Sequence, residues 1–235
     1  MDDLTPLSMM SAPTARRPLL GLTVLVVEDS KFACDALRLM CLRSGARIRR
    51  ADCLASARRH LQVYRPSVAI IDMGLPDGSG AELIEELSRG TPRIDVVLGT
   101  SGDSFTEEVA RAAGADGFLA KPLESLAAFQ EAILSRLPVD RRPCGPRKLP
   151  VDTIKPDPVA YRDDLCHAAE ALQGNTSLDY VARFLSGIAL SAHDLALQRA
   201  ADSVTRGRAE GKLLNADVVR LRQLVDARIA REPAI

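Results

Sequence analysis

The chain has 235 residues, and its 31 basic and 31 acidic side chains give a formal net charge of zero. A chain-wide positive field that would attract nucleic acid is therefore absent, and any such surface would have to be local. Hydrophobic residues make up 46% and charged residues 26% of the chain, a balance typical of soluble proteins that bury a core. The length suits one large domain or two small ones.

The five cysteines are scattered, odd in number and free of any Cys-x-x-Cys pair. This pattern argues against both a disulfide framework and a zinc site, and it favours a reducing compartment. Residues 1–18 contain no apolar segment of signal-peptide length, and the longest apolar run, 22–27, is far shorter than the roughly 20 residues that span a bilayer. We expect a cytoplasmic protein without a membrane segment.

Residues 1–18 are rich in Pro, Ser, Met and Thr and predict a flexible arm, after which strand and helix patterns alternate. Continuous apolar runs such as 23–27 are typical of strands buried on both faces of a parallel sheet. The expected strands are 23–27, 47–51, 68–71, 95–98 and 117–120, and the expected helices are 32–44, 55–64, 81–88, 106–113 and 126–137. Five such alternations predict an α/β domain over 19–138, with a doubly wound, five-stranded parallel sheet of the flavodoxin-like type.

Prolines and basic residues are interleaved across 139–158, and this composition predicts an extended, semi-stiff linker. Beyond it, apolar residues recur only at helical spacing. The expected helices are 159–172, 178–190, 195–206 and 216–230. Four helices joined by short loops predict a small all-α bundle as a second domain, residues 159–235.

The residues that could carry chemistry collect where the expected strands end. In a doubly wound parallel sheet, the carboxyl ends of the strands meet at one crevice. We therefore expect three carboxylates, a hydroxyl and an ammonium group to lie close together, contributed by Glu28, Asp29, Asp72, Thr100 or Ser101, and Lys121.

Three neighbouring carboxylates repel one another unless a divalent cation lies among them. Hard oxygen ligands of this kind suit Mg²⁺ together with a phosphate oxygen. A carboxylate that attacks a phosphoryl group also needs the transferring oxygens neutralised, which a metal ion, an ammonium and a hydroxyl around Asp72 would supply. Each residue alone has a plainer explanation, such as Asp29 as a helix cap or Lys121 as a surface lysine. Their occurrence at successive strand ends favours a site for phosphoryl transfer.

Four segments around these residues resemble the receiver domains of bacterial two-component response regulators. They follow the family's order over about residues 20–138 and read VLVVEDS, IIDMGLPDG, TSG and GADGFLAKP at 24–30, 70–78, 100–102 and 114–122. The resemblance implies that Asp72 accepts a phosphoryl group from a sensor histidine kinase or a phosphotransfer protein.

The resemblance also implies a Mg²⁺ site. Asp29 and Asp72 would bind the ion directly, Glu28 would act through water, and Gly74 would offer its backbone carbonyl. Lys121 would pair with the phosphoryl oxygens, aimed by a cis peptide bond to the proline that follows it.

The family's switch pair is a hydroxyl after the fourth strand and an aromatic residue on the fifth. Thr100 and Ser101 both fit the hydroxyl position, and we prefer Ser101 because Gly102 follows it, as a small residue does in the family. Phe118 takes the aromatic position without the phenol oxygen of the commoner tyrosine, so burial alone would drive its inward movement. Phosphorylation adds about −1.5 to −2 units of charge and would shift the domain between two packings.

The sequence leaves the role of residues 159–235 open. Basic and acidic residues are equal in number there and no helix-turn-helix is evident, which does not favour DNA binding as output. The motif of a histidine-phosphotransfer bundle, a His followed three residues later by Lys and Gly, does not occur, so that alternative reduces to an internal or degenerate bundle. Motifs of cyclases and phosphodiesterases are also missing, so we expect no enzymatic output. We favour a protein-interaction or self-dimerisation domain that phosphorylation of Asp72 switches.

Overall fold

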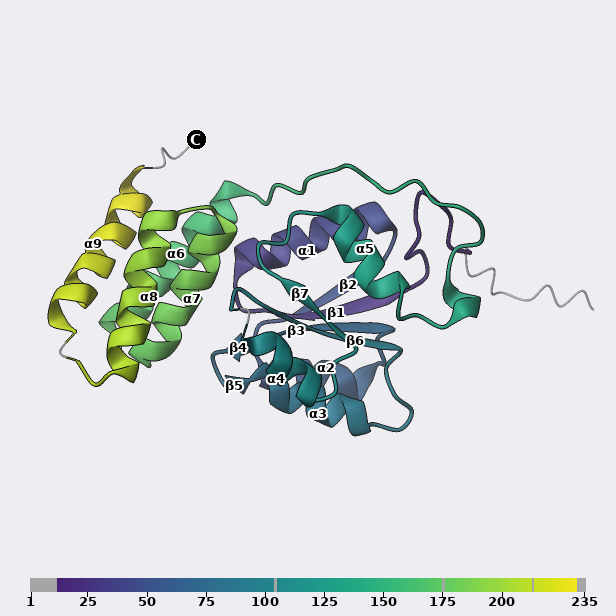
Figure 1. The fold of residues 1–235 in the computed structure, drawn as a ribbon, viewed down its shortest axis with the longest axis horizontal. Helices are drawn as coiled ribbons and strands as arrows, with labels where there is room; N and C mark the ends of the chain where they lie inside the picture. Colours follow the sequence, from purple (N-terminus) through teal and green to yellow (C-terminus); the bar gives the residue numbers. More distant parts are fainter. Residues whose placement is uncertain (1–11, 104, 175, 213, 232–235) are drawn as a thin grey trace, which may run out of the picture.

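The computed structural model describes residues 12–103, 105–174, 176–212 and 214–231 (Figure 1). Five parallel strands form one sheet in the order β2-β1-β3-β6-β7. They are β1 (Thr23–Val27), β2 (Arg47–Ala51), β3 (Val68–Asp72), β6 (Val96–Ser101) and β7 (Gly117–Ala120). This confirms the predicted doubly wound α/β fold. Residues 1–11 of the predicted arm lie outside the described residues.

Helices cover both faces of the sheet (Figure 1). On one face lie α1 (Lys31–Ser44) and α5 (Leu126–Leu134), and on the other lie α2 (Leu54–Val63), α3 (Gly80–Arg89) and α4 (Thr106–Ala112). A short antiparallel pair, β4 (Gly74–Leu75) with β5 (Gly78–Ser79), connects β3 to α3 and was not predicted. Two residues a strand are too few to produce a period in the sequence.

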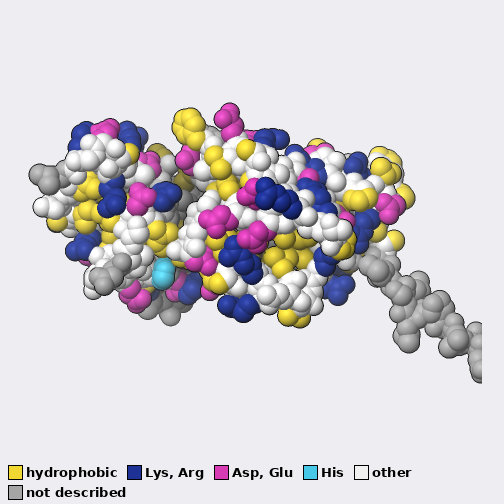
Figure 2. Space-filling model, turned by 90° about the horizontal axis from the view of Figure 1, so that it is seen from below, with side chains coloured by type: hydrophobic (Ala, Val, Ile, Leu, Met, Phe, Trp, Pro, Cys, Tyr) yellow, Lys and Arg dark blue, Asp and Glu magenta, His cyan; other side chains and the backbone are white. Residues whose placement is uncertain are grey.

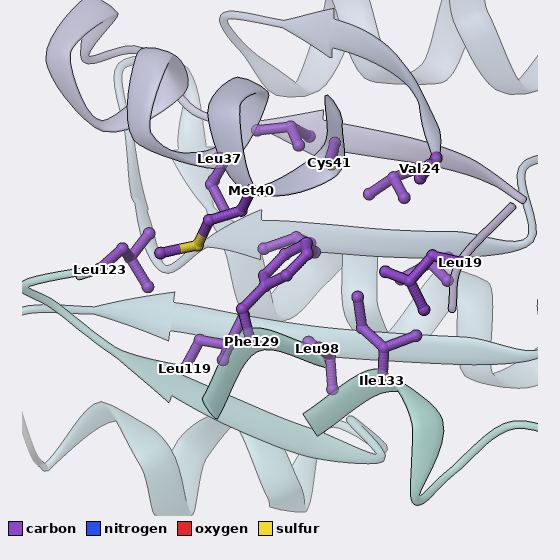
Figure 3. Packing of buried hydrophobic residues seen from close by; sticks show 14 of the residues in the cluster. Leu19, Val24, Leu37, Met40, Cys41, Leu98, Leu119, Leu123, Phe129 and Ile133 are labelled. Carbon is purple, nitrogen blue, oxygen red and sulfur yellow. The ribbon is translucent and has the colours of Figure 1, made fainter. Parts of the chain in front are cut away.

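The core explains why the central strands are continuously apolar. β1 and β3 have neighbours in the sheet on both sides and helices on both faces, and all five residues of β3 are buried. Figure 3 shows Phe129 of α5 pointing into the cluster between the sheet and α1, close to Met40 and Leu98. β2 lies at the edge of the sheet and is mostly exposed, as its arginines predict.

Local signals set the ends of α1, which positions the site. The Ser30 hydroxyl accepts a hydrogen bond from the N–H of Ala33 and so caps the first turn. Gly45 ends the helix with φ of 86°, a left-handed conformation that glycine adopts without strain. The first turn of α1 therefore begins directly after the strand end that carries Glu28 and Asp29.

The predicted linker contains the short 3₁₀ helix η1 (Val139–Arg141) and then runs extended along the α/β domain (Figure 1). Ile154 is only 1% exposed and belongs to the same core cluster as Phe129. Its N–H donates to the carbonyl of Glu124 at 2.8 Å. The segment is thus extended, as its prolines predict, but a buried isoleucine anchors it to the domain.

The C-terminal region consists of α6 (Pro158–Gln173), α7 (Leu178–Ser191), α8 (Leu195–Ala209) and α9 (Asn215–Arg231), which form a bundle as predicted. Its core is separate from those of the α/β domain and comprises mainly Leu, Val and Ala side chains, among them Leu165, Val181, Leu185, Leu197 and Leu221. Asp194 caps α8 and also binds Arg228 of α9, with Oδ2 and Nε 2.7 Å apart.

The bundle lies beside the α/β domain, next to β4 and the start of α1 (Figure 1). Positive and negative side chains are interspersed over both parts of the molecule on the face that Figure 2 shows. Among the described residues, every helix falls short of the length and apolar character that a membrane crossing requires.

Candidate functional site

Three carboxylates meet at the carboxyl end of the sheet. Glu28 and Asp29 follow β1, and Asp72 is the last residue of the neighbouring strand β3. One oxygen from each of the three lies within 4.8 Å of the others. Glu28 is 2% exposed and Asp72 7% exposed, so the cluster is largely removed from water.

Lys121, at the end of β7, reaches into this cluster. Its Nζ lies 2.7 Å from Oε2 of Glu28 and 3.1 Å from Oδ1 of Asp72. The N–H of Lys121 donates to the carbonyl of Ser101 at 2.9 Å, which ties the ends of β7 and β6 together. The peptide bond from Lys121 to Pro122 is cis, as the resemblance implied.

The electrostatics show an excess of negative charge. Burial raises the pKa of Glu28 well above its usual range, and the charges of Asp72 and Asp29 add to this, against the effect of Lys121. Burial, followed by the charge of Asp72, also raises the pKa of Asp29 to about 6. Burial alone would lower the pKa of Lys121, but the charges of Asp72 and Glu28 raise it.

The donor set fits a divalent cation. One ammonium faces three carboxylates, so two negative charges remain uncompensated when all three acids are ionised. Mg²⁺ prefers oxygen ligands and often uses one or two carboxylates together with water and phosphate. The residues that could hold it are therefore Asp29 and Asp72, with Glu28 behind them.

Gly74 lies where the sequence placed it, two residues after Asp72 and in β4. Its N–H donates to Oδ2 of Asp72 at 3.3 Å, while Oδ1 faces Lys121. Both oxygens of the acceptor candidate are thus oriented by the chain. A role of the Gly74 carbonyl as a metal ligand stays a prediction.

The two candidate switch hydroxyls have different surroundings. Thr100 is fully buried, and its hydroxyl donates to the carbonyl of Leu119 at 2.7 Å. Ser101 is partly exposed and lines the pocket that contains Asp72 and Lys121. Adjacent residues of a strand point to opposite faces of the sheet, so only one of the two hydroxyls can face this pocket.

Phe118 lies on the face that carries Ser101. Gly99, two residues before Ser101, packs against its ring: a Cβ on Gly99 would lie 3.1 Å from Cδ2 of Phe118 and 2.8 Å from Cβ of Ala110. Glycine at this position therefore provides room for the ring between β6 and α4.

A known protein family matches the part of the chain that carries this cluster. The profile of the response regulator receiver domain family covers residues 24–133, which include all the site residues named so far. Residues 24–133 form a response regulator receiver domain. In this family, phosphorylation and a dependence on Mg²⁺ are general.

Individual relatives match the same share of the chain. The transcriptional regulatory protein PhoP of Escherichia coli (strain K12) is 30% identical over 116 residues, 48% of this chain and 52% of that protein. The virulence transcriptional regulatory protein PhoP of Shigella flexneri gives the same values. The chain spans about half the length of these curated relatives.

Among solved structures, a putative response regulator from Chloroflexus aurantiacus J-10-fl is 28% identical, with a TM-score of 0.45. That comparison covers 49% of this chain and 98% of the other. The family match ends at residue 133, so α6 to α9 lie outside the receiver domain.

Two residues of the bundle contact the receiver domain's site and were not predicted from the sequence. The hydroxyl of Tyr180 in α7 donates to Oδ2 of Asp29 at 2.6 Å. Asp164 in α6 accepts hydrogen bonds from the start of α1. Both lie more than 130 residues from their partners, and no motif or period connects positions so far apart.

Proposed function

We propose that this chain is a response regulator that accepts a phosphoryl group on Asp72 in a Mg²⁺-dependent reaction. The observation that carries the proposal is the position of Asp72 at the end of β3, beside the carboxylates of Glu28 and Asp29 and 3.1 Å from the ammonium of Lys121. The receiver-domain match supports it, because acceptance of a phosphoryl group is general in that family.

The donor is a phosphohistidine on a sensor histidine kinase or a phosphotransfer protein. An oxygen of Asp72 forms a bond to phosphorus, while the bond from phosphorus to the imidazole nitrogen breaks and its electron pair stays with the donor. Lys121, already 3.1 Å from Asp72, pairs with the phosphoryl oxygens. Asp29 and Asp72 would hold Mg²⁺ beside the acceptor, and the bound ion would neutralise further charge on the phosphoryl group.

Ser101 is the switch hydroxyl in this proposal. It faces the pocket with Asp72 and Lys121, whereas the hydroxyl of Thr100 is used in a buried bond to Leu119. Movement of Ser101 toward the phosphoryl group opens space for Phe118, which packs beside the same strand. The receiver domain then shifts toward a second packing.

The bundle formed by α6 to α9 is the output part, and we propose that it acts by protein interaction or self-dimerisation. Equal numbers of basic and acidic residues over 159–235 support this over DNA binding. Its histidines support it over phosphotransfer: His167 packs against the ring of Phe184, and His193 binds Glu124 with Nε2 and Oε1 2.6 Å apart.

The test is intact-mass spectrometry after incubation with Mg²⁺ and acetyl phosphate. Acetyl phosphate is a small donor that transfers its phosphoryl group and releases acetate. We expect one added phosphoryl group on the wild-type protein, unstable at alkaline pH as an acyl phosphate should be, and none on Asp72→Asn. Asp103→Asn is the matched control, because Asp103 also lines the pocket but is exposed. A label that survives Asp72→Asn would refute the proposal, and light scattering of the same samples reports whether the molar mass rises.

A further inference from the structure

The bundle holds the receiver domain at the start of α1. The carboxylate of Asp164 accepts hydrogen bonds from the Ser30 hydroxyl at 2.7 Å, the N–H of Lys31 at 2.9 Å and the N–H of Phe32 at 3.0 Å. Asp164 is only 2% exposed. The first N–H groups of a helix have no partner within the helix and attract negative charge. Asp164 of α6 thus accepts hydrogen bonds from N–H groups in the first turn of α1, a helix of the other domain.

A second contact reaches the phosphorylation site itself. Tyr180 of α7 donates its hydroxyl to Asp29, one of the three clustered carboxylates. The bundle therefore binds a carboxylate that the proposed function assigns to the Mg²⁺ site.

Apolar contacts complete the interface. The ring of Phe32 in α1 lies 5.6 Å from the ring of Tyr161 in α6, centroid to centroid. Gly102, which follows β6, fits closely against α7, since a Cβ there would lie 2.9 Å from Cδ2 of Leu190. The loop that carries the proposed switch hydroxyl is therefore in direct contact with the bundle.

Between the two parts lies a pocket of about 380 Å³. Asp72, Lys121 and Ser101 line it from the receiver domain, and apolar and polar side chains of α7 and α8 line the opposite wall, among them Phe184, Ile188, Leu190, Gln198 and Asp202. This volume is in the range of small-molecule sites, whereas a helix with its side chains is about 10 Å across. Acetyl phosphate is small enough for a pocket of this volume, whereas a folded donor domain is not, so such a donor reaches Asp72 only in molecules whose bundle has moved away, and phosphorylation then keeps them open.

We propose that α6 and α7 form a docking surface for the receiver domain's own phosphorylation face, and that phosphorylation of Asp72 releases the bundle. The inference rests on the proposed function, because it needs Asp72 to be the acceptor. It adds the direction of control: the unphosphorylated protein is the closed form.

The charge of the phosphoryl group explains the release. About −1.5 to −2 units of charge enter a pocket whose bundle side carries Phe184, Ile188 and the carboxylate of Asp202. Arg183 also lines the pocket, but its guanidinium is paired with Asp179 at 2.6 Å. The docked bundle keeps water away from the added charge, whereas in the open form water can hydrate the phosphoryl group. Phosphorylation therefore favours the open form. Movement of Ser101 toward the phosphoryl group also displaces Gly102 from its contact with Leu190.

Hydrogen exchange of the full chain, followed by mass spectrometry, tests the docking contact. In Asp164→Ala the N–H groups of Lys31 and Phe32 lose a buried charged acceptor, and we expect their exchange to accelerate roughly tenfold or more. Tyr180→Phe, which keeps the ring, should accelerate exchange in the same peptides to a smaller extent. The matched control is Asp163→Ala, next to Asp164 on α6, whose ion pair with Lys31 is exposed on both sides; it should change exchange less than about threefold.

Phosphorylation of the wild-type protein with acetyl phosphate and Mg²⁺ should accelerate exchange at the start of α1 as Asp164→Ala does, and Asp72→Asn should not respond. Intact mass is measured on every sample. Phosphorylated protein with unchanged or slower exchange at the start of α1 would overturn this inference and leave the proposed function intact. Protein that takes up no phosphoryl group would overturn both.

Discussion

Thr100 and Ser101 are neighbours in β6, yet their hydroxyls have opposite environments. Thr100 donates to Leu119 in the core, whereas Ser101 lines the pocket. Thr100→Val leaves the Leu119 carbonyl without that partner, and we expect it to lower the free energy of unfolding by about 1–3 kcal/mol. Ser101→Ala should change it by no more than about 0.5 kcal/mol. Urea denaturation measures both values.

The response to phosphorylation should be lost in Ser101→Ala, the more stable variant, and kept in Thr100→Val, the less stable one. Ser101→Ala removes the hydroxyl that we propose moves toward the phosphoryl group, so phosphorylation should no longer alter hydrogen exchange in the loop after β6. In Thr100→Val that response should persist. A response that Thr100→Val abolishes and Ser101→Ala retains would assign the switch to Thr100 instead.

At the scale of the elements, Ile154 anchors the linker to the receiver domain, because its side chain packs into the core of that domain. The side chain is 1% exposed in the main core cluster. Ile154→Ala should lower the free energy of unfolding by about 2–5 kcal/mol and speed tryptic cleavage after Arg147 and Lys148. Val151→Ala is the control, because Val151 is 93% exposed. Equal cleavage rates in the two variants would show that Ile154 does not anchor the linker.

An ion pair between Asp194 and Arg228 joins α8 to α9 in the bundle. The hydrogen bond from Arg228 holds the pKa of Asp194 below its usual range, with help from the N–H of Leu197. A lowered pKa in the folded state means that the carboxylate stabilises the fold above its unfolded pKa, near 3.9, and that this stabilisation is lost as the pH falls through the folded value.

We therefore expect Asp194→Asn to destabilise the bundle at pH 7 by about 1.5–3 kcal/mol, and to differ much less from wild type near pH 2. Asp179→Asn removes an exposed ion pair with Arg183 within one helix and should cost under about 0.5 kcal/mol. Circular dichroism during urea denaturation at several pH values measures these differences. A loss in Asp194→Asn that stays constant with pH would contradict the assigned role of the carboxylate.

The sequence predicted the elements of this protein well because most of them carry a period or a cap. The five strands of the sheet and the helices lie within a few residues of the expected ranges. The pair β4 and β5 was missed because it has only two residues a strand. The anchoring of the linker was missed because one isoleucine among prolines has no pattern.

At the scale of the whole molecule, the sequence predicted what was local and missed what joins the domains. Strand ends converge by the topology of the sheet, so Asp29, Asp72 and Lys121 could be grouped from their positions in the sequence alone. The partners Tyr180 and Asp164 could not, since Asp164 reads as one of many acids on an amphipathic helix. Their contacts depend on how the bundle packs against α1, which neither helical spacing nor composition specifies.

These contacts lead to our central claim, that the state of Asp72 decides whether the bundle covers the phosphorylation face. Small-angle X-ray scattering of the full chain, before and after acetyl phosphate with Mg²⁺, tests it most directly, beside Asp72→Asn and with the molar mass measured on the same samples. We predict a larger radius of gyration per protomer for the phosphorylated wild type and no change for Asp72→Asn. An unchanged or smaller radius in protein that carries the phosphoryl group would contradict the claim.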